Sequence, residues 1–168
     1  MNVFFARVFF VLVLLCATAA PAVVGEPGAH RVGYEVLLDW ASFDAWLARI
    51  SAAPLTAFDT ETTGLDPMAA TLVGMSFAVV EGEAAYLPLA HTYPDAPAQL
   101  PLAEVLDKLR PWLESETHAK LGQNLKYDAH ILANHGIRLA GIVEDTLLES
   151  YILESDKSHD MDSLASRH

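Results

Sequence analysis

Residues 55–61 read LTAFDTE, an apolar run that ends in two acids, and this stretch decides the fold prediction. The apolar residues predict a buried strand, on which Asp59 and Glu61 point to the same face because they are two residues apart. Two like charges at this spacing repel, and no Lys or Arg is near them in the sequence. A hard divalent cation would relieve the repulsion. For such a pair on its own, a strand end that emerges into solvent is the commoner explanation.

The segments that follow place further residues beside this pair. Residues 62–66 (TTGLD) turn the chain and are expected to leave Leu65 exposed or half-exposed. Farther on, residues 122–128 read GQNLKYD. Asp128 falls early in a predicted helix, and Leu125 and Leu132 flank it at i−3 and i+4, so it is predicted to face inward and to need a partner. The alternative is that its charge only compensates the helix dipole. Asn124 and Tyr127 are expected at the same opening.

Periodicity along the remaining sequence predicts alternating strands and helices. We expect strands at residues 34–38, 118–122 and 137–143, and a hairpin of residues 71–80 and 84–90. Helices are expected from a Ser42 cap through Ile50, from Pro101 through Glu114, from an Asn124 cap through His135 with Gly136 after it, from a Thr146–Glu149 capping box through Leu153, and for one turn near Asp162. The sum is an α/β domain with a mixed sheet.

Length and charge limit the classes of protein that fit. The 168 residues suit one domain, and 52% of them are hydrophobic, which excludes intrinsic disorder. Ten Lys and Arg against 22 Asp and Glu give a net charge of −12, the opposite of a protein that binds nucleic acid through its own basic surface. Any contact with phosphate must be local or carried by bound cations. The single cysteine, Cys16, excludes intramolecular disulfides and cysteine-based metal sites.

The N-terminus differs in composition from the rest. Residues 8–20 read VFFVLVLLCATAA, follow Arg7 and precede the Pro/Gly-containing stretch PAVVGEPG. An apolar run of this length suits a signal peptide and is short for a membrane span. We therefore divide the chain into a signal-like or foreign segment, residues 1–30, and a domain, residues 31–168. The alternative is that the segment is the product of a mis-started or truncated reading frame.

Several spaced motifs together resemble one known family. They are Phe58–Thr62, Gly122–Asp128, Asp145–Leu153 and His159–Ala165. In this order they resemble the 3′–5′ proofreading exonuclease domain of bacterial DNA polymerase I, a member of the four-carboxylate (DEDD) exonuclease superfamily with a ribonuclease H-like fold. The resemblance runs from about Tyr34 to the last residue. Any one motif alone would be a weak signal.

The resemblance implies a site with two divalent cations, Mg²⁺ or Mn²⁺, and no small-molecule cofactor. Asp59 would bridge both ions, Glu61 would hold the first and Asp128 the second, and these three would be the catalytic and metal-binding residues. The residues expected to contact nucleic acid are Thr62, Leu65, Gln123, Asn124 and Tyr127, with Asp145 as a candidate in the layer behind the ligands. The expected substrate is DNA with a single-stranded or frayed 3′ end. A full-length family member would also carry a polymerase domain and would be cytoplasmic.

One part of the family pattern is missing from the 168 residues. The third motif, Tyr-x-x-x-Asp or His-x-x-x-x-Asp, does not follow the second motif here, since Tyr151 is followed by Asp156 at i+5 and His159 by Leu164. We therefore expect a C-terminally incomplete domain that is weakly active or inactive. The alternative function is a catalytically inactive nucleic-acid-binding or spacer module with the same fold.

Overall fold

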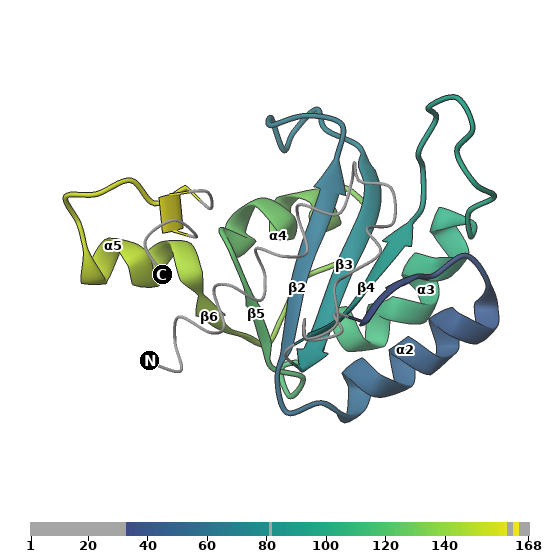
Figure 1. Ribbon diagram of the computed structural model, residues 1–168, viewed down its shortest axis with the longest axis horizontal. Helices are drawn as coiled ribbons and strands as arrows, with labels where there is room; N and C mark the ends of the chain where they lie inside the picture. Colours follow the sequence, from purple (N-terminus) through teal and green to yellow (C-terminus); the bar gives the residue numbers. More distant parts are fainter. Residues whose placement is uncertain (1–32, 81, 161–162, 165–168) are drawn as a thin grey trace, which may run out of the picture.

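A computed structural model describes residues 33–80, 82–160 and 163–164, which form one mixed sheet flanked by helices (Figure 1). The strands are β1 (Gly33–Val36), β2 (Thr56–Thr62), β3 (Leu72–Val80), β4 (Glu83–Pro88), β5 (Lys120–Gly122) and β6 (Ile142–Asp145). The helices are α2 (Trp40–Ala52), α3 (Leu102–Leu113), α4 (Leu125–Ala133) and α5 (Thr146–Leu153). The predicted α/β class, the mixed sheet and the hairpin are confirmed.

Strand direction brings three chain segments to one edge of the sheet. The strand order is β1-β4-β3-β2-β5-β6, and β3 is antiparallel to both of its neighbours. By contrast, β2, β5 and β6 are parallel to one another. Their carboxyl ends therefore lie together, and this is the edge of an α/β sheet where ligands usually bind.

One face of the sheet forms the hydrophobic core with α2, α3 and α4. Pairing of β2 with β3 sets Phe58 beside Phe77, and both rings lie 6.0 Å from the ring of Trp112 on α3. Burial of one such ring contributes roughly 1.5–3 kcal/mol. Because side chains alternate along a strand, the residues on either side of Phe58 point to the opposite face, where Asp59 lies.

Helix α2 begins earlier than the sequence pattern predicted. Asp39, not Ser42, is its N-cap, because the Asp39 carboxylate accepts a hydrogen bond of 2.9 Å from the backbone N–H of Ser42. The predicted apolar stripe is confirmed, since Phe43, Trp46 and Ile50 are buried against the sheet. The start at Ser42 was wrong because the residues between the two candidate caps lie within the first helical turn.

The strand predicted at residues 137–143 is displaced towards the C-terminus. Ile137 and Leu139 are buried, which produced the apolar pattern, but they contact the core without joining the sheet. The backbone N–H of Ala140 donates to the carbonyl of Leu113 at the end of α3 instead of to a strand. Gly141, at a φ of +73°, then redirects the chain into β6.

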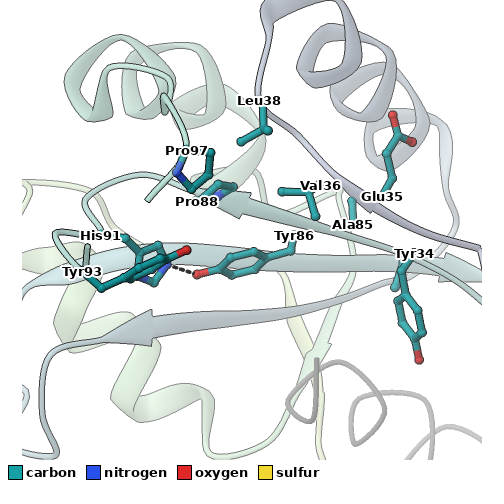
Figure 2. Close-up of a pocket in the computed structure, with 11 residues that line it drawn as sticks. Tyr34, Glu35, Val36, Leu38, Ala85, Tyr86, Pro88, His91, Tyr93 and Pro97 are labelled. Carbon is teal, nitrogen blue, oxygen red and sulfur yellow. Dashed lines mark hydrogen bonds between the residues drawn. The ribbon is translucent and has the colours of Figure 1, made fainter. Parts of the chain in front are cut away.

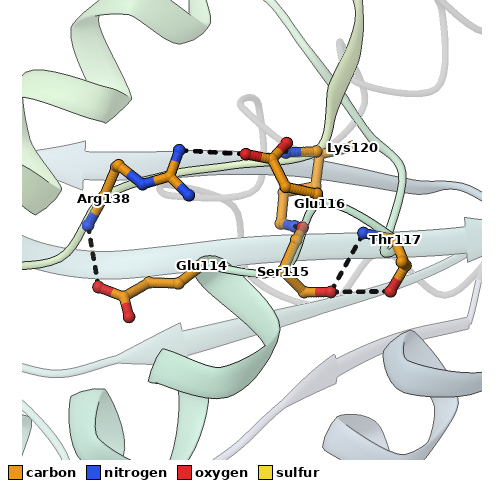
Figure 3. Close-up of polar contacts among 7 residues, drawn as sticks. Glu114, Ser115, Glu116, Thr117, Lys120 and Arg138 are labelled. Carbon is orange, nitrogen blue, oxygen red and sulfur yellow. Dashed lines mark hydrogen bonds and ion pairs between the residues drawn. The ribbon is translucent and has the colours of Figure 1, made fainter.

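Polar contacts fix the opposite end of the sheet (Figure 3). Arg138 pairs with Glu116 at 3.1 Å, and the backbone N–H of Arg138 donates to Glu114 at 3.2 Å. Lys120 is buried beneath them and donates to the carbonyl of His118 at 2.9 Å. Burial lowers the pKa of the Lys120 ammonium to about 8. These contacts join the loop after α3 to the segment before β6.

The predictions for residues 1–30 lie outside the described residues. Among the helices that are described, none has both the length and the apolar character needed to cross a membrane.

Candidate active site

Two carboxylates of the site lie at the end of β2. Asp59 pairs across the sheet with Ser76, and Glu61 pairs with Gly74, so both acids project from the same face, as predicted. Both side chains are half-buried. In the described part of the chain, neither acid forms an ion pair with a Lys, Arg or His. The negative charge at this end of the strand is therefore not neutralised by a side chain.

The third carboxylate, Asp128, comes from the first turns of α4. It is 1% exposed, which confirms the prediction that it faces inward. Its Oδ1 accepts two hydrogen bonds from Thr60, one from the backbone N–H at 2.8 Å and one from the hydroxyl at 2.6 Å. Its Oδ2 is buried and has no hydrogen-bond partner. Thr60 was not predicted as a site residue, although its place between the two acids on the opposite face was visible in the sequence.

Burial disfavours the charged form of all three carboxylates. Burial raises the pKa of Asp59 to about 8, and the nearby charges of Asp128 and Glu61 add to this rise. Burial also raises the pKa of Asp128, against the opposing effect of the Thr60 hydrogen bonds, and raises the pKa of Glu61. Neighbouring carboxyl groups whose pKa values are raised in this way are typical of functional sites.

One cavity of about 480 Å³ joins the carboxylates to the residues predicted to contact nucleic acid. The side of α4 that faces the cavity contributes Asp128 and Tyr127, and the segment before the helix contributes two polar side chains. The lining residues include Asp59, Glu61, Thr62, Leu65, Gln123, Asn124, Tyr127 and Asp128. Leu65 is 96% exposed at the opening. The structure thus brings together every predicted site residue except Asp145.

Tyr127 holds the turn after β2 against α4. Its hydroxyl lies 2.6 Å from the Thr62 hydroxyl and also donates to the carbonyl of Gly64. Asn134 adds a second link, because its amide donates to the carbonyl of Pro67 at 2.8 Å. The exposed Leu65 therefore projects from a turn that is fixed on both sides.

Asp145 positions two helices instead of lining the cavity. Its carboxylate accepts from the backbone N–H groups of Asn124 at 3.0 Å, Leu125 at 2.9 Å and Leu147 at 3.0 Å. It is the N-cap of α5, so the predicted Thr146–Glu149 capping box was wrong. Asn124 is the N-cap residue of α4, as predicted, but it has a φ of +60° and its side chain makes no capping hydrogen bond. Asp145 is the acid that holds both helix starts.

Gln123 connects the cavity to the C-terminal part of the chain. Its amide donates to the carbonyl of His159 at 3.1 Å, and the Thr146 hydroxyl donates to its carbonyl oxygen. His159 is itself held, since Nδ1 lies 2.8 Å from the hydroxyl of Ser150. The amide of Gln123 is therefore already engaged within the protein.

The oxygen donors suit a hard divalent cation, but the described residues do not form a complete set of ligands. Within those residues, no three His, Cys, Asp or Glu side chains are arranged to hold a metal ion. The unpartnered Oδ2 of Asp128 and the crowded charge around Asp59 nevertheless fit a cation in their chemistry. Mg²⁺ commonly uses one or two carboxylates and takes its other ligands from water and substrate phosphate.

A tyrosine that the sequence did not single out lies beside Glu61. A Cβ built on Gly74 would lie 2.2 Å from the hydroxyl of Tyr86, so the phenol occupies the space above this glycine. Gly74 is the pairing partner of Glu61. Burial raises the pKa of Tyr86, and the charge of Glu61 raises it further, which keeps the phenol protonated. No local pattern could reveal this contact, because it depends on the pairing of β2, β3 and β4.

Comparison with known proteins gives one family. A family model described as a 3′–5′ exonuclease matches residues 34–168. DNA polymerase I of Pseudomonas aeruginosa is 54% identical over 145 residues, a match that covers 84% of this chain and 16% of that protein. The chain spans about a sixth of the length of the curated relatives it matches.

Solved structures show the same fold. The POL domain of Pol1 from M. smegmatis, in complex with DNA primer-template and dNTP, gives a TM-score of 0.61 at 24% identity, over 79% of this chain and 22% of that chain. Brucella melitensis NrnC with bound Mg²⁺ gives a TM-score of 0.55 at 19% identity, over 82% of this chain and 61% of that chain. The predicted ribonuclease H-like fold is confirmed.

Proposed function

Because the chain belongs to the 3′–5′ exonuclease family of the DNA polymerase I type, we propose that its domain hydrolyses the terminal phosphodiester at 3′ ends of DNA. The observation that carries the proposal is the convergence of Asp59, Glu61 and Asp128 on one cavity. The relatives are DNA polymerases, so the 3′ ends in question are those on which a polymerase domain works. Single-stranded or frayed ends suit the site, because the exposed apolar side chain of Leu65 lies at its opening.

Asp59, Glu61 and Asp128 are the residues that would hold two divalent cations. When bound, such ions would supply a lowered pKa for water at neutral pH and would stabilise negative charge on the departing 3′ oxygen. Thr60 has a defined part in this arrangement. Its two hydrogen bonds fix Oδ1 of Asp128, which leaves Oδ2 available as the ligand atom.

The residues around the carboxylates would position the terminal nucleotide. Leu65 would wedge against the terminal bases from its fixed turn, and Asn124 and Tyr127 would contact the sugar and phosphate at the opening. Apolar wedging and stacking accept any base, which suits removal of whatever nucleotide is frayed. The net charge of −12 opposes the approach of phosphate, so the cations would also carry the electrostatic part of binding.

We expect the 168-residue polypeptide to be weakly active, because its sequence lacks the third family motif after Asp128. Loss of an outer partner of a metal ligand alone costs about 10–100-fold in affinity or activity. Loss of a direct ligand should cost more, and a reacting atom misplaced by about 1 Å can cost ~10²-fold.

Digestion of 5′-labelled single-stranded DNA in Mn²⁺ tests the function. A ladder that shortens from the 3′ end is expected, and it should be faster for a chain extended through the family's third motif. Asp59→Ala with Glu61→Ala should reduce it to background, whereas Asp107→Asn, which removes an exposed carboxylate of α3, should not. Digestion that survives the double substitution contradicts the assignment. Equal rates for the short and extended chains contradict the role given to the missing motif.

A second candidate is an inactive nucleic-acid-binding module with the same fold. The observation that favours it is the lack of a three-residue metal cluster among the described side chains. Calorimetric titration with Mn²⁺ separates the two candidates when it is combined with the digest. Saturable binding that depends on Asp59 and Asp128, without turnover in the short or the extended chain, favours the inactive module.

A further inference from the structure

A second cavity, of about 430 Å³, is lined by residues of β1, β4 and the segments that follow these strands (Figure 2). Strand pairing sets Val36, Tyr86, Ser76 and Asp59 in one row across β1, β4, β3 and β2. Since neighbouring strands are about 4.8 Å apart, the backbones of Tyr86 and Asp59 are separated by roughly 10 Å. The cavity is therefore a neighbour of the candidate active site on the same surface.

Tyr86 connects the second cavity to the neighbourhood of Glu61. Its ring lines the second cavity, and its hydroxyl lies over Gly74, the partner of Glu61. The hydroxyl also forms a hydrogen bond with Nε2 of His91 (Figure 2). Tyr86 thus lies between the aromatic lining of the second cavity and Glu61.

The loop after β4 holds the rest of this wall in place. Gln99 forms two hydrogen bonds with the backbone of His91: its carbonyl oxygen accepts from the N–H at 2.8 Å, and its amide donates to the carbonyl at 2.9 Å. The His91 ring lies 5.9 Å from the ring of Tyr86 and 5.5 Å from the ring of Tyr93. These two hydrogen bonds order the loop around His91. A loop of this length inside a compact domain often has a function.

The chemistry of the cavity suits a flat uncharged ring. Tyr93 is 55% exposed, and Tyr34 and Val36 are also exposed large side chains on this surface. Glu35 is the charged carboxylate among the lining residues, and it accepts a hydrogen bond of 2.7 Å from Trp46. Among the described residues that line the cavity there is no Lys or Arg, so none of them offers a phosphate a fixed positive charge.

We infer that this aromatic cavity is a second subsite for single-stranded DNA, in which Tyr93 stacks on a base of the strand whose 3′ end lies at Asp59 and Glu61. The inference rests on the proposed function and deepens it. Base stacking on aromatic side chains accepts every base, and it needs no cation at the subsite. Continuity with the carboxylates through Tyr86 favours a nucleic-acid strand over a protein segment as the occupant.

The test is the affinity of the full chain for 5′-fluorescein oligothymidylates with nuclease-resistant phosphorothioate linkages, measured by fluorescence anisotropy in Mn²⁺, which supplies the cations that the carboxylates would hold. Tyr93→Ala should weaken binding of a long oligonucleotide by about 5- to 150-fold. Tyr93→Phe should keep wild-type affinity because the ring is retained. A dinucleotide should lose less affinity than the long oligonucleotide in Tyr93→Ala, because fewer of its bases can reach Tyr93 from the candidate active site. Ile152→Ala, which removes an exposed apolar side chain on α5, is the control.

Unchanged affinity in Tyr93→Ala overturns the subsite, and so do equal losses of affinity for the dinucleotide and the long oligonucleotide. A third contrary result is that wild type is an oligomer and Tyr93→Ala is a monomer, because the surface is then a protein interface. Failure of the proposed function gives a different combination of digestion and binding results. If Mn²⁺ supports no digestion by the short or the extended chain while Tyr93-dependent binding persists, the subsite stands and the exonuclease assignment falls. If digestion occurs and Tyr93→Ala binds normally, only the subsite is lost.

Discussion

The most direct consequence of the site geometry is a pH-dependent instability caused by Asp59. In the folded protein the pKa of this carboxyl is about 8, against an ordinary value of 3.8. Between these two values the folded state holds a proton that the unfolded state has lost. The free energy of unfolding therefore falls as the pH rises from about 4 to about 8. Asp59→Asn keeps the shape of the neutral carboxyl and removes the titration, so this variant should be more stable than wild type at pH 7.

The size of the effect follows from the pKa. From 3.8 to pH 7 is about three pH units, and each corresponds to about 1.4 kcal/mol, which gives an upper limit of roughly 4 kcal/mol. For a chain of this length, 1 kcal/mol moves the Tm by about 3 °C, so the limit is ~12 °C. At pH 4 wild type and Asp59→Asn should melt together. The slope that remains in the variant belongs to Asp128 and Glu61, whose pKa values burial also raises.

Thermal melts of wild type, Asp59→Asn and Asp107→Asn across this pH range provide the assay. Asp107 is exposed on α3, so its variant controls for the change in net charge. Mn²⁺ should stabilise wild type, by about 2.7 kcal/mol at ~100 times its Kd, because it neutralises the same charges. Parallel curves for all three proteins would refute the reasoning. So would a response to Mn²⁺ that survives Asp59→Ala with Glu61→Ala.

Three further predictions concern the scaffold. Gly122→Ala should destabilise the fold by about 1–3 kcal/mol in chemical denaturation, because its Cβ would lie 2.5 Å from Leu125, whereas Gly64→Ala, where the space is open, should be near neutral; equal effects contradict the packing. Because the pKa of Lys120 falls from 10.5 to about 8, stability should rise with pH across that interval, and Lys120→Met should flatten the rise in melts. Deletion of residues 1–30 should leave the cooperativity and midpoint of unfolding unchanged and improve solubility; a large loss of cooperativity would show that the segment is packed.

Local periodicity was enough for the parts of this protein that depend on neighbours in the chain. The period of two on a strand placed Asp59 and Glu61 on one face, and the spacing of Leu125 and Leu132 on a helix placed Asp128 inside. The same rules predicted the α/β class, and the spaced motifs indicated the family. The orientation of these side chains and the pattern of strands and helices are set by residues within a turn or two of one another, whereas the family was indicated by the order of motifs spread along the chain.

Contacts between distant segments needed the tertiary structure. Thr60 and Asp128 are 68 residues apart, and only the docking of α4 on β2 makes one the donor to the other. The two helix starts held by Asp145 depend in the same way on β5 and β6 being parallel neighbours. Tyr86 reaches Glu61 only through the register of two strand pairs. Strand order and register depend on how the whole core packs, so they cannot be predicted from a local sequence pattern.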